Sequence, residues 1–186
     1  MPATPGTRLV FTDMDGSLLD HYSYSFRPAL PALRELERLG VPVIPATSKT
    51  RAELAPLREA LGSHAPFITE NGAAVYIPAG TFPAQPEDTV ERDGYWVREF
   101  AGPRRRWLDL LQDQAAEFGT EYSTFFKAGV DGIVAMTGLS LEAAALANDR
   151  EYSEPVRWRG DAQRLEAFLA ALTEGGATVQ LSLIHI

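Results

Sequence analysis

Residues 9 to 20 read LVFTDMDGSLLD, and this stretch decides the fold. An apolar, strand-forming run ends directly at Asp13, and a second carboxylate, Asp15, follows two positions later. Gly16 and Ser17 allow the backbone to turn there. Two carboxylates about 4 Å apart repel each other by roughly 4 kcal/mol at an effective dielectric constant near 20. We therefore expect a cation and a phosphoryl group to bind where this strand ends.

The first third of the chain alternates between strand and helix patterns. We predict strands at 9–12, 41–46 and 66–69, and helices at 28–39 and 51–61. Three strands with helical crossovers predict a parallel, doubly wound α/β sheet, in which ligands bind at the carboxyl ends of the strands. The sequences DMD (13–15), TSK (47–49) and ENG (70–72) all fall at those ends.

The rest of the chain predicts an inserted α+β domain. A strand at 73–78 leaves the first part, and 79–92 reads as a linker or an extended hairpin loop. We expect a helix with an apolar stripe at 108–118, helices capped by Ser140 and Asp161, a strand at 156–158 and a returning strand at 177–181. The expected domains are 1–80 for the first part of the core, 81–176 for the inserted domain and 177–186 for the start of the return.

Composition excludes several classes of protein. A net charge of −8 and a pI near 4.9 argue against nucleic acid as a partner. The absence of cysteine excludes disulfides and cysteine zinc sites. No run approaches the roughly 20 apolar residues that span a bilayer, and the N-terminus lacks the pattern of a secretory signal. We expect a cytoplasmic protein without a membrane partner.

The three strand-end clusters together predict phosphoryl transfer. A carboxylate such as Asp13 can accept a phosphoryl group as a nucleophile, and Asp15 can protonate the leaving oxygen. Mg²⁺ bridging the nucleophile and the phosphate would offset the charge and orient the attack. Thr47 and Ser48 can hydrogen-bond a phosphate oxygen, and Lys49 adds a positive charge. Taken singly, each cluster also fits a helix cap or a tight turn, with Asn71-Gly72 favouring positive φ.

The string FTDMDGSLLD resembles the first motif of haloacid dehalogenase-type (HAD) phosphohydrolases. The resemblance implies that Asp13 is the nucleophile and a magnesium ligand. It implies that Asp15 is the acid/base, with its backbone carbonyl on the metal, and that Thr47 is the hydroxyl of the second motif. The order of core and insertion is similar to the subclass with a type IIB (C2B) cap on a HAD-like Rossmannoid core.

Four further strings, PATSKTRAE, PFITENGAAVYIP, TGLS and REYSEP, resemble the mannosyl-3-phosphoglycerate phosphatase family, over about residues 8–180. That family releases phosphate and the compatible solute mannosylglycerate from a small phosphorylated sugar-glycerate. The resemblance implies substrate contacts from Glu70, Asn71, Gly72 and Arg150. Arg157, Arg159 and Lys127 are further candidates for a basic lining, and each of these three residues and Arg150 also fits a solvated surface charge. We expect Arg104–Arg106 to be solvated and the three tryptophans to pack in the core.

Two features of that family have no counterpart here: a lysine after the cap and a later GDxxND-like acidic pair. We therefore expect a core that is incomplete at its C-terminus, an inactive and poorly stable fragment, and an exposed edge at the first strand. The tail LSLIHI (181–186) can be written in codons of a sequencing adapter, so we expect it to be non-native.

Three alternative interpretations stay open. One is another type IIB sugar phosphatase, acting on glucosyl-3-phosphoglycerate or sucrose phosphate. The second is a phospho-acceptor receiver domain, which the DxDGSLLD string and the inserted domain argue against. The third is a non-catalytic, ligand-binding fragment.

Overall fold

The computed structural model describes residues 8–20 and 23–181. The chain divides into two compact units, Met1–Ala101 and Gly102–Ile186. The division therefore lies after Ala101, whereas the sequence places the start of the inserted domain at residue 81. The stretch between them stays with the first unit because its strand Tyr95–Glu99 pairs with the preceding strand Ala74–Pro78, and its strand Val90–Arg92 pairs with Tyr95–Glu99. The extent of core and cap as functional domains stays a prediction.

Among the described residues of the first unit there are six strands and several short helices. In chain order these are β1 (Val10–Thr12), η1 (Arg27–Ala29), α1 (Leu30–Arg38), β2 (Val43–Pro45), α2 (Arg51–Leu61), β3 (Phe67–Thr69), η2 (Glu70–Gly72), β4 (Ala74–Pro78), β5 (Val90–Arg92) and β6 (Tyr95–Glu99). The predicted alternation of strand and helix over the first third is confirmed, with each strand shorter than expected.

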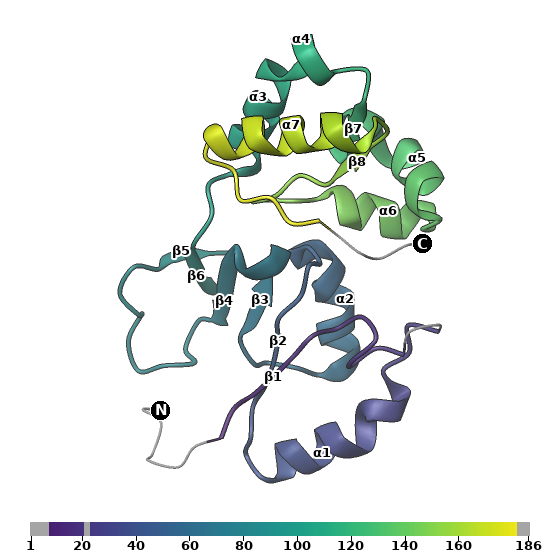
Figure 1. The fold of residues 1–186 in the computed structure, drawn as a ribbon. Coiled ribbons are helices and arrows are strands. Elements are labelled where there is room, and N and C mark those ends of the chain that lie inside the picture. The colour runs from purple at the N-terminus through teal and green to yellow at the C-terminus, as the bar shows by residue number, and fades with distance from the viewer. Residues whose placement is uncertain (1–7, 21–22, 182–186) are drawn as a thin grey trace. The chain divides into compact units, whose positions relative to one another are not determined.

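The parallel relation predicted for the first three strands is confirmed (Figure 1). β1 pairs with β2 in parallel, with Thr12 opposite Pro45, and β2 is continued by a parallel bridge between Ala46 and Ile68. The prolines at 42 and 45 are tolerated because the hydrogen bonds between this segment and β1 use the Pro42 carbonyl and the Ala46 N–H, and none of these bonds needs a proline N–H. Val10 N donates to the Pro42 carbonyl at 3.0 Å, and Ala46 N donates to the Thr12 carbonyl at 2.8 Å.

A four-stranded antiparallel sheet in the order β3-β4-β6-β5 completes the first unit. Its core is aromatic: the rings of Phe67 and Tyr76 stack at 5.0 Å, and Tyr95 meets both rings edge-on. The buried guanidinium of Arg58 lies 4.2 Å from the centre of the Phe67 ring. Burial lowers the pKa of Arg58, and Tyr95 partly offsets this effect.

Strand β1 forms an exposed edge, as the sequence predicts. Among the described strands its one hydrogen-bonded neighbour is β2. The side chain of Phe11 is 60% exposed and that of Leu9 is 52% exposed. Helix α1 likewise has no buried residue, and Leu39 after it is 56% exposed. Phe11 on β1, Leu9 before it and Leu39 after α1 therefore face solvent rather than a covering layer.

The second unit is an α+β arrangement. Its elements are α3 (Arg104–Asp113), α4 (Ala115–Phe118), β7 (Tyr122–Thr124), α5 (Phe125–Thr137), α6 (Leu141–Asn148), β8 (Val156–Trp158) and α7 (Ala162–Glu174). β7 and β8 pair antiparallel, and their inner side chains pack with α3, α4 and α7. The core of this layer consists of Leu111, Phe118, Tyr122, Phe168 and Leu172, with Trp158 against it. The predicted caps Ser140 and Asp161 are confirmed.

Several expectations for the second unit are wrong. No strand forms at 177–181; this segment is tied to α7 by the Ala177 N bond to the Leu172 carbonyl, and no described strand pairs with it. The helix at 108–118 breaks at Gln114 into α3 and α4. Helix α5 was not predicted, because Gly129 and Gly132 interrupt its pattern. The tail lies almost entirely outside the described residues.

Arg104 is not solvated, contrary to expectation. Its Nε lies 2.6 Å from Oε2 of Glu154, and the two side chains are 13% and 1% exposed. Arg104 also donates to the carbonyl and the side-chain oxygen of Asn148. A run of three arginines conceals this role because only the first of them reaches a buried partner. The expected packing of Trp96 and Trp158 in the core is confirmed.

Candidate active site

The candidate nucleophile lies on a tight loop directly after β1. Asp13 is exposed, while Met14 and Leu19 beside it are buried and anchor the loop. Leu18 N donates to the Asp13 carbonyl at 3.3 Å, and Leu19 N donates to the Met14 carbonyl at 2.8 Å. Gly16 adopts φ +70°, which glycine accepts without strain. The sequence thus folds so that its apolar residues hold a carboxylate outward at the strand end.

The clusters that the sequence places at three strand ends do come together. Asn71 N donates to the Thr47 carbonyl at 3.0 Å, and Glu70 N donates to the Lys49 carbonyl at 3.0 Å, which joins the second cluster to the third. Lys49 Nζ lies 3.0 Å from Asp15 Oδ1, which joins the second cluster to the first. A single polar edge therefore carries the candidate nucleophile, acid/base, hydroxyl and cation.

A second carboxylate, which the sequence did not indicate, lies near the ammonium group of Lys49. Besides Asp15, Oε1 of Glu53 lies 3.9 Å from its Nζ, and the ring of Tyr24 lies 5.8 Å away. Oδ1 of Asp15 is shielded from water and accepts no hydrogen bond of good geometry from a described residue. This oxygen is instead paired with the Lys49 ammonium through an ion pair. Lys49 and Glu53 are four residues apart at the start of α2, and this spacing could have predicted their contact from the sequence.

A capping box fixes the backbone of the second cluster. Thr50 is fully buried, its hydroxyl accepts from Glu53 N at 3.0 Å, and Glu53 Oε2 accepts from Thr50 N at 2.8 Å. Thr47 is 4% exposed, and its hydroxyl accepts from Lys49 N at 3.2 Å. The turn that presents Thr47, Ser48 and Lys49 is thereby held at both ends.

The third cluster forms a tight turn with left-handed backbone. Glu70, Asn71 and Gly72 have φ of +48°, +60° and +90°. Glu70 is buried at 3% exposure. A glutamate in this conformation costs of order 1–3 kcal/mol and persists where surrounding contacts impose it. The expected role of these residues in binding substrate stays a prediction, as does that of Arg150, whose Nε donates to Ser153 Oγ in the second unit.

The donor set at this edge fits a magnesium ion. Mg²⁺ is bound in proteins through one or two carboxylates with several waters and substrate oxygens. Asp13 offers an exposed carboxylate and Asp15 a half-buried one with a shielded oxygen. Over residues 8–20 and 23–181, no group of three or more His, Cys, Asp and Glu side chains gathers that could hold a metal by itself. An ion here would therefore depend on water and phosphate oxygens.

The comparisons with known proteins agree with this geometry. The haloacid dehalogenase-like hydrolase family matches residues 10–85, which include all three clusters. A curated protein from Methanococcoides burtonii, named glucosyl-3-phosphoglycerate/mannosyl-3-phosphoglycerate phosphatase, is 40% identical over 153 residues, or 82% of this chain and 56% of its own length. Over residues 10–85 the chain is therefore similar to the haloacid dehalogenase-like hydrolases. The resemblance to mannosyl-3-phosphoglycerate phosphatases is likewise confirmed.

Two further curated relatives give the same result. A Persephonella marina protein with the same double name is 34% identical over 79% of the chain and 54% of its own length. A mannosyl-3-phosphoglycerate phosphatase from Pyrococcus furiosus is 37% identical over 80% of the chain and 60% of its own length. The chain therefore spans little more than half the length of the curated relatives it matches.

Solved structures show the same fold at lower identity. A hypothetical protein from Geobacillus kaustophilus superposes with a TM-score of 0.58 at 20% identity, covering 91% of this chain and 64% of its own. A HAD-superfamily phosphatase from Bacteroides thetaiotaomicron gives a TM-score of 0.56 at 18% identity, covering 91% and 63%. The predicted HAD-like core with an added α+β part is thus confirmed as a fold. Within the described residues, no helix is long and apolar enough to cross a membrane.

Proposed function

We propose that this chain is the nucleophile-bearing part of a phosphatase that hydrolyses mannosyl-3-phosphoglycerate to mannosylglycerate and phosphate in the cytoplasm. The observation that carries the proposal is the joining of Asp13–Asp15 to Thr47–Lys49 at one polar edge, in a chain whose relatives bear that name. The substrate is a small molecule with two anionic groups, a phosphate and a carboxylate. Its phosphate would be bound by Thr47, Ser48 and Lys49, and the turn at 70–72 would contact the substrate.

In the proposed mechanism, a carboxylate oxygen of Asp13 attacks the phosphorus atom and the ester oxygen leaves with its electron pair. Asp15 donates a proton to that oxygen, so the sugar-glycerate departs as an alcohol. Asp15, now ionised, accepts a proton from the water that attacks the aspartyl-phosphate and releases inorganic phosphate. Exposure of Asp13 and partial burial of Asp15 suit these roles.

Mg²⁺ is part of this proposal. Asp13, through its carboxylate, and Asp15, through its backbone carbonyl, would hold the ion. When bound, Mg²⁺ supplies neutralising charge between the nucleophile and the phosphate.

A second substrate has specific support. Two of the three relatives described above are named for both glucosyl-3-phosphoglycerate and mannosyl-3-phosphoglycerate. We therefore propose glucosyl-3-phosphoglycerate as an alternative substrate. No such observation favours sucrose phosphate.

The test uses a protein extended to the length of these relatives and purified with Mg²⁺. We expect this protein to release phosphate from mannosyl-3-phosphoglycerate. The substitution Asp13→Asn should reduce turnover at least 1,000-fold, as expected for a lost nucleophile (about 4 kcal/mol). Removal of Mg²⁺ by EDTA should abolish turnover reversibly. Undiminished turnover by Asp13→Asn would refute the proposal. We also propose that the 186-residue chain by itself is inactive, and phosphate release by it would contradict this.

A further inference from the structure

The ammonium group of Lys49 lies between two carboxylates that come from different parts of the first unit. Oδ1 of Asp15, in the loop after β1, is 3.0 Å from Nζ of Lys49. Oε1 of Glu53, in the first turn of α2, is 3.9 Å from the same nitrogen. The side chains of Lys49 and Glu53 are only 16% and 18% exposed. The fold therefore provides a second acidic neighbour for a lysine that already has one.

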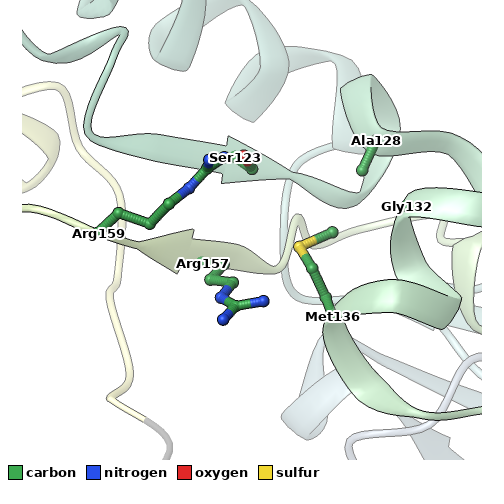
Figure 2. Close-up of a pocket in the computed structure, with 6 residues that line it drawn as sticks. All are labelled: Ser123, Ala128, Gly132, Met136, Arg157 and Arg159. Atoms are coloured by element: carbon green, nitrogen blue, oxygen red, sulfur yellow. The ribbon is translucent and has the colours of Figure 1, made fainter.

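The acidic composition of the chain does not by itself explain this arrangement. Arg157 and Arg159, on β8 and the segment after it, line a cavity of the second unit (Figure 2), and neither forms an ion pair with a described residue. The other residues that line this cavity carry no charge and are Ser123, Ala128, Gly132 and Met136. Cations of this chain can thus lack a carboxylate partner within the described residues, whereas Lys49 has two.

The place of Lys49 in the chain explains why its ammonium group needs carboxylates. Lys49 directly precedes Thr50, the N-cap of α2, and so lies at the positive end of the helix dipole. A cation at this end is repelled by the free N–H groups of the first helical turn. The ammonium group stays here because carboxylates attract it. With Asp15 alone, it could still turn about that single contact.

The carboxylate of Glu53 is itself held in place. Its Oε2 accepts from Thr50 N at 2.8 Å, and the Thr50 hydroxyl accepts from Glu53 N at 3.0 Å, which is the reciprocal pattern of a capping box. Because the backbone engages Oε2, the other oxygen, Oε1, is the one near Lys49 Nζ. A carboxylate fixed in this way can restrict the movement of the ammonium group, which a mobile one could not.

We propose that Glu53 is a positioning residue, which holds the Lys49 ammonium against Asp15 and thereby fixes the orientation of the acid/base carboxyl group. This rests on the proposed function, in which Asp15 exchanges protons with the leaving oxygen and with water. An ammonium group has three N–H donors, so two carboxylates leave one donor for a phosphate oxygen. Positioning by Glu53 is therefore compatible with a contact between Lys49 and the substrate phosphate.

The first experiment separates the charge of Glu53 from its role in the cap. Glu53→Gln removes the charge but keeps an oxygen that can accept from Thr50 N, since glutamine also serves in a capping box. In a protein of the relatives' length, we expect this substitution to lower kcat about 3- to 10-fold, with a smaller change in KM. Tm should shift by less than about 4 °C. Glu59→Gln, at an exposed position of the same helix, is the matched control and should change neither kcat nor Tm.

A double-mutant cycle shows whether Glu53 acts through Lys49. In a Lys49→Ala background, Glu53→Gln should change kcat by less than about 2-fold, because the ammonium group that it holds is gone. An equal loss of kcat in both backgrounds would refute the inference. An unchanged kcat in the single Glu53→Gln variant would refute it as well.

A measurement without turnover keeps this inference separate from the proposed function. The 186-residue chain contains two lysines, Lys49 and Lys127, so isotope-labelled lysine gives two ε-methylene signals in an NMR spectrum. Lys127 is exposed and serves as the internal reference. We expect Lys49 to have the higher order parameter of the two. Glu53→Gln, but not Glu59→Gln, should lower the Lys49 value to below about 0.6, the range of flexible groups.

The two proposals can fail separately. If Glu53→Gln lowers the Lys49 order parameter, but the protein of the relatives' length releases no phosphate from mannosyl-3-phosphoglycerate, the proposed function alone is refuted. If that protein is active and Glu53→Gln leaves the Lys49 signal unchanged, this inference alone is refuted.

Discussion

Lys49 Nζ lies 3.0 Å from Oδ1 of Asp15, and the two side chains are only 16% and 34% exposed. From the sequence, Lys49 is interpreted as a cation for the substrate phosphate. In the structure its ammonium contacts the candidate acid/base, with Glu53 as a second, more distant carboxylate. The contact fixes one oxygen of Asp15 and thereby the orientation of its carboxyl group. A lysine between two carboxylates can set the geometry of proton transfer without touching the phosphate.

The first prediction separates these two roles of Lys49. In a protein of the relatives' length, we expect Lys49→Ala to lower kcat by about 10- to 100-fold, the effect of losing a charged hydrogen-bond partner. If Lys49 positions Asp15, KM should change less than kcat, and Lys49→Arg should restore part of the rate. Arg38→Ala on the exposed helix α1 is the control. A rise in KM at constant kcat would instead assign Lys49 to the phosphate.

The second prediction concerns the capping box that holds this lysine in place. Thr50→Ala removes the hydroxyl that accepts from Glu53 N, at a cost of about 1 kcal/mol in the free energy of unfolding. Thr50→Ser keeps the hydroxyl and should lose much less. Urea unfolding of the 186-residue chain and both variants measures the difference. Equal destabilisation by alanine and serine would show that packing of the buried methyl group, rather than the cap, is the main contribution.

Sequence reasoning succeeded where a pattern is local. The strand-loop-helix alternation of the first third, the caps at Ser140 and Asp161, and the meeting of three strand ends follow from hydrophobic runs, turn residues and the geometry of parallel sheets. Asn71-Gly72 predicted positive φ, and both residues have it. These signals lie within a few residues of the feature that they specify.

The failures share a different cause, which is dependence on distant partners. Arg104 looks solvated within its run, but Glu154, fifty residues away, makes it a buried ion pair. The strand predicted at 177–181 has the right composition, yet a strand forms only where another strand offers hydrogen bonds. Helix α5 contains two glycines that lower its local propensity, and packing against α6 outweighs that loss. The contact between Lys49 and Asp15 is equally invisible in a single sequence.

The third prediction tests the buried pair of Arg104 and Glu154. Glu154→Gln should leave the guanidinium of Arg104 without its counter-charge and lower the free energy of unfolding by about 3 kcal/mol. Glu154 Oε1 also accepts from Phe126 N at 2.8 Å, so the start of α5 should loosen as well. The exposed pair of Arg105 and Asp109 is the control, and Asp109→Asn should leave the unfolding midpoint unchanged. Equal effects of the two substitutions would contradict the prediction.

The fourth prediction is a pH dependence in the second unit. Burial raises the pKa of Tyr122 above its usual value of 10.0, and its hydroxyl donates to the Leu111 carbonyl at 2.5 Å. The neutral phenol therefore contributes stability that is fully present below pH 10, and this contribution falls as the pH rises from 10 through the folded pKa. Tyr122→Phe should cost about 1 kcal/mol at neutral pH and remove this decline. A decline above pH 10 that is the same in the phenylalanine variant would refute the assignment to Tyr122.

The fifth prediction concerns the exposed edge at β1. An apolar strand with one described neighbour and a 60% exposed phenylalanine can pair with other chains. In the 186-residue chain, we expect Phe11→Lys to slow aggregation, measured by light scattering, without lowering the melting temperature. Phe100→Lys is the control, since Phe100 is 63% exposed but lies outside β1. In a protein of the relatives' length, where we propose that further strands cover β1, the same Phe11→Lys should destabilise the fold by about 3–5 kcal/mol, as for other losses of a buried aromatic side chain. An unchanged stability there would show that β1 is an edge in the longer protein too.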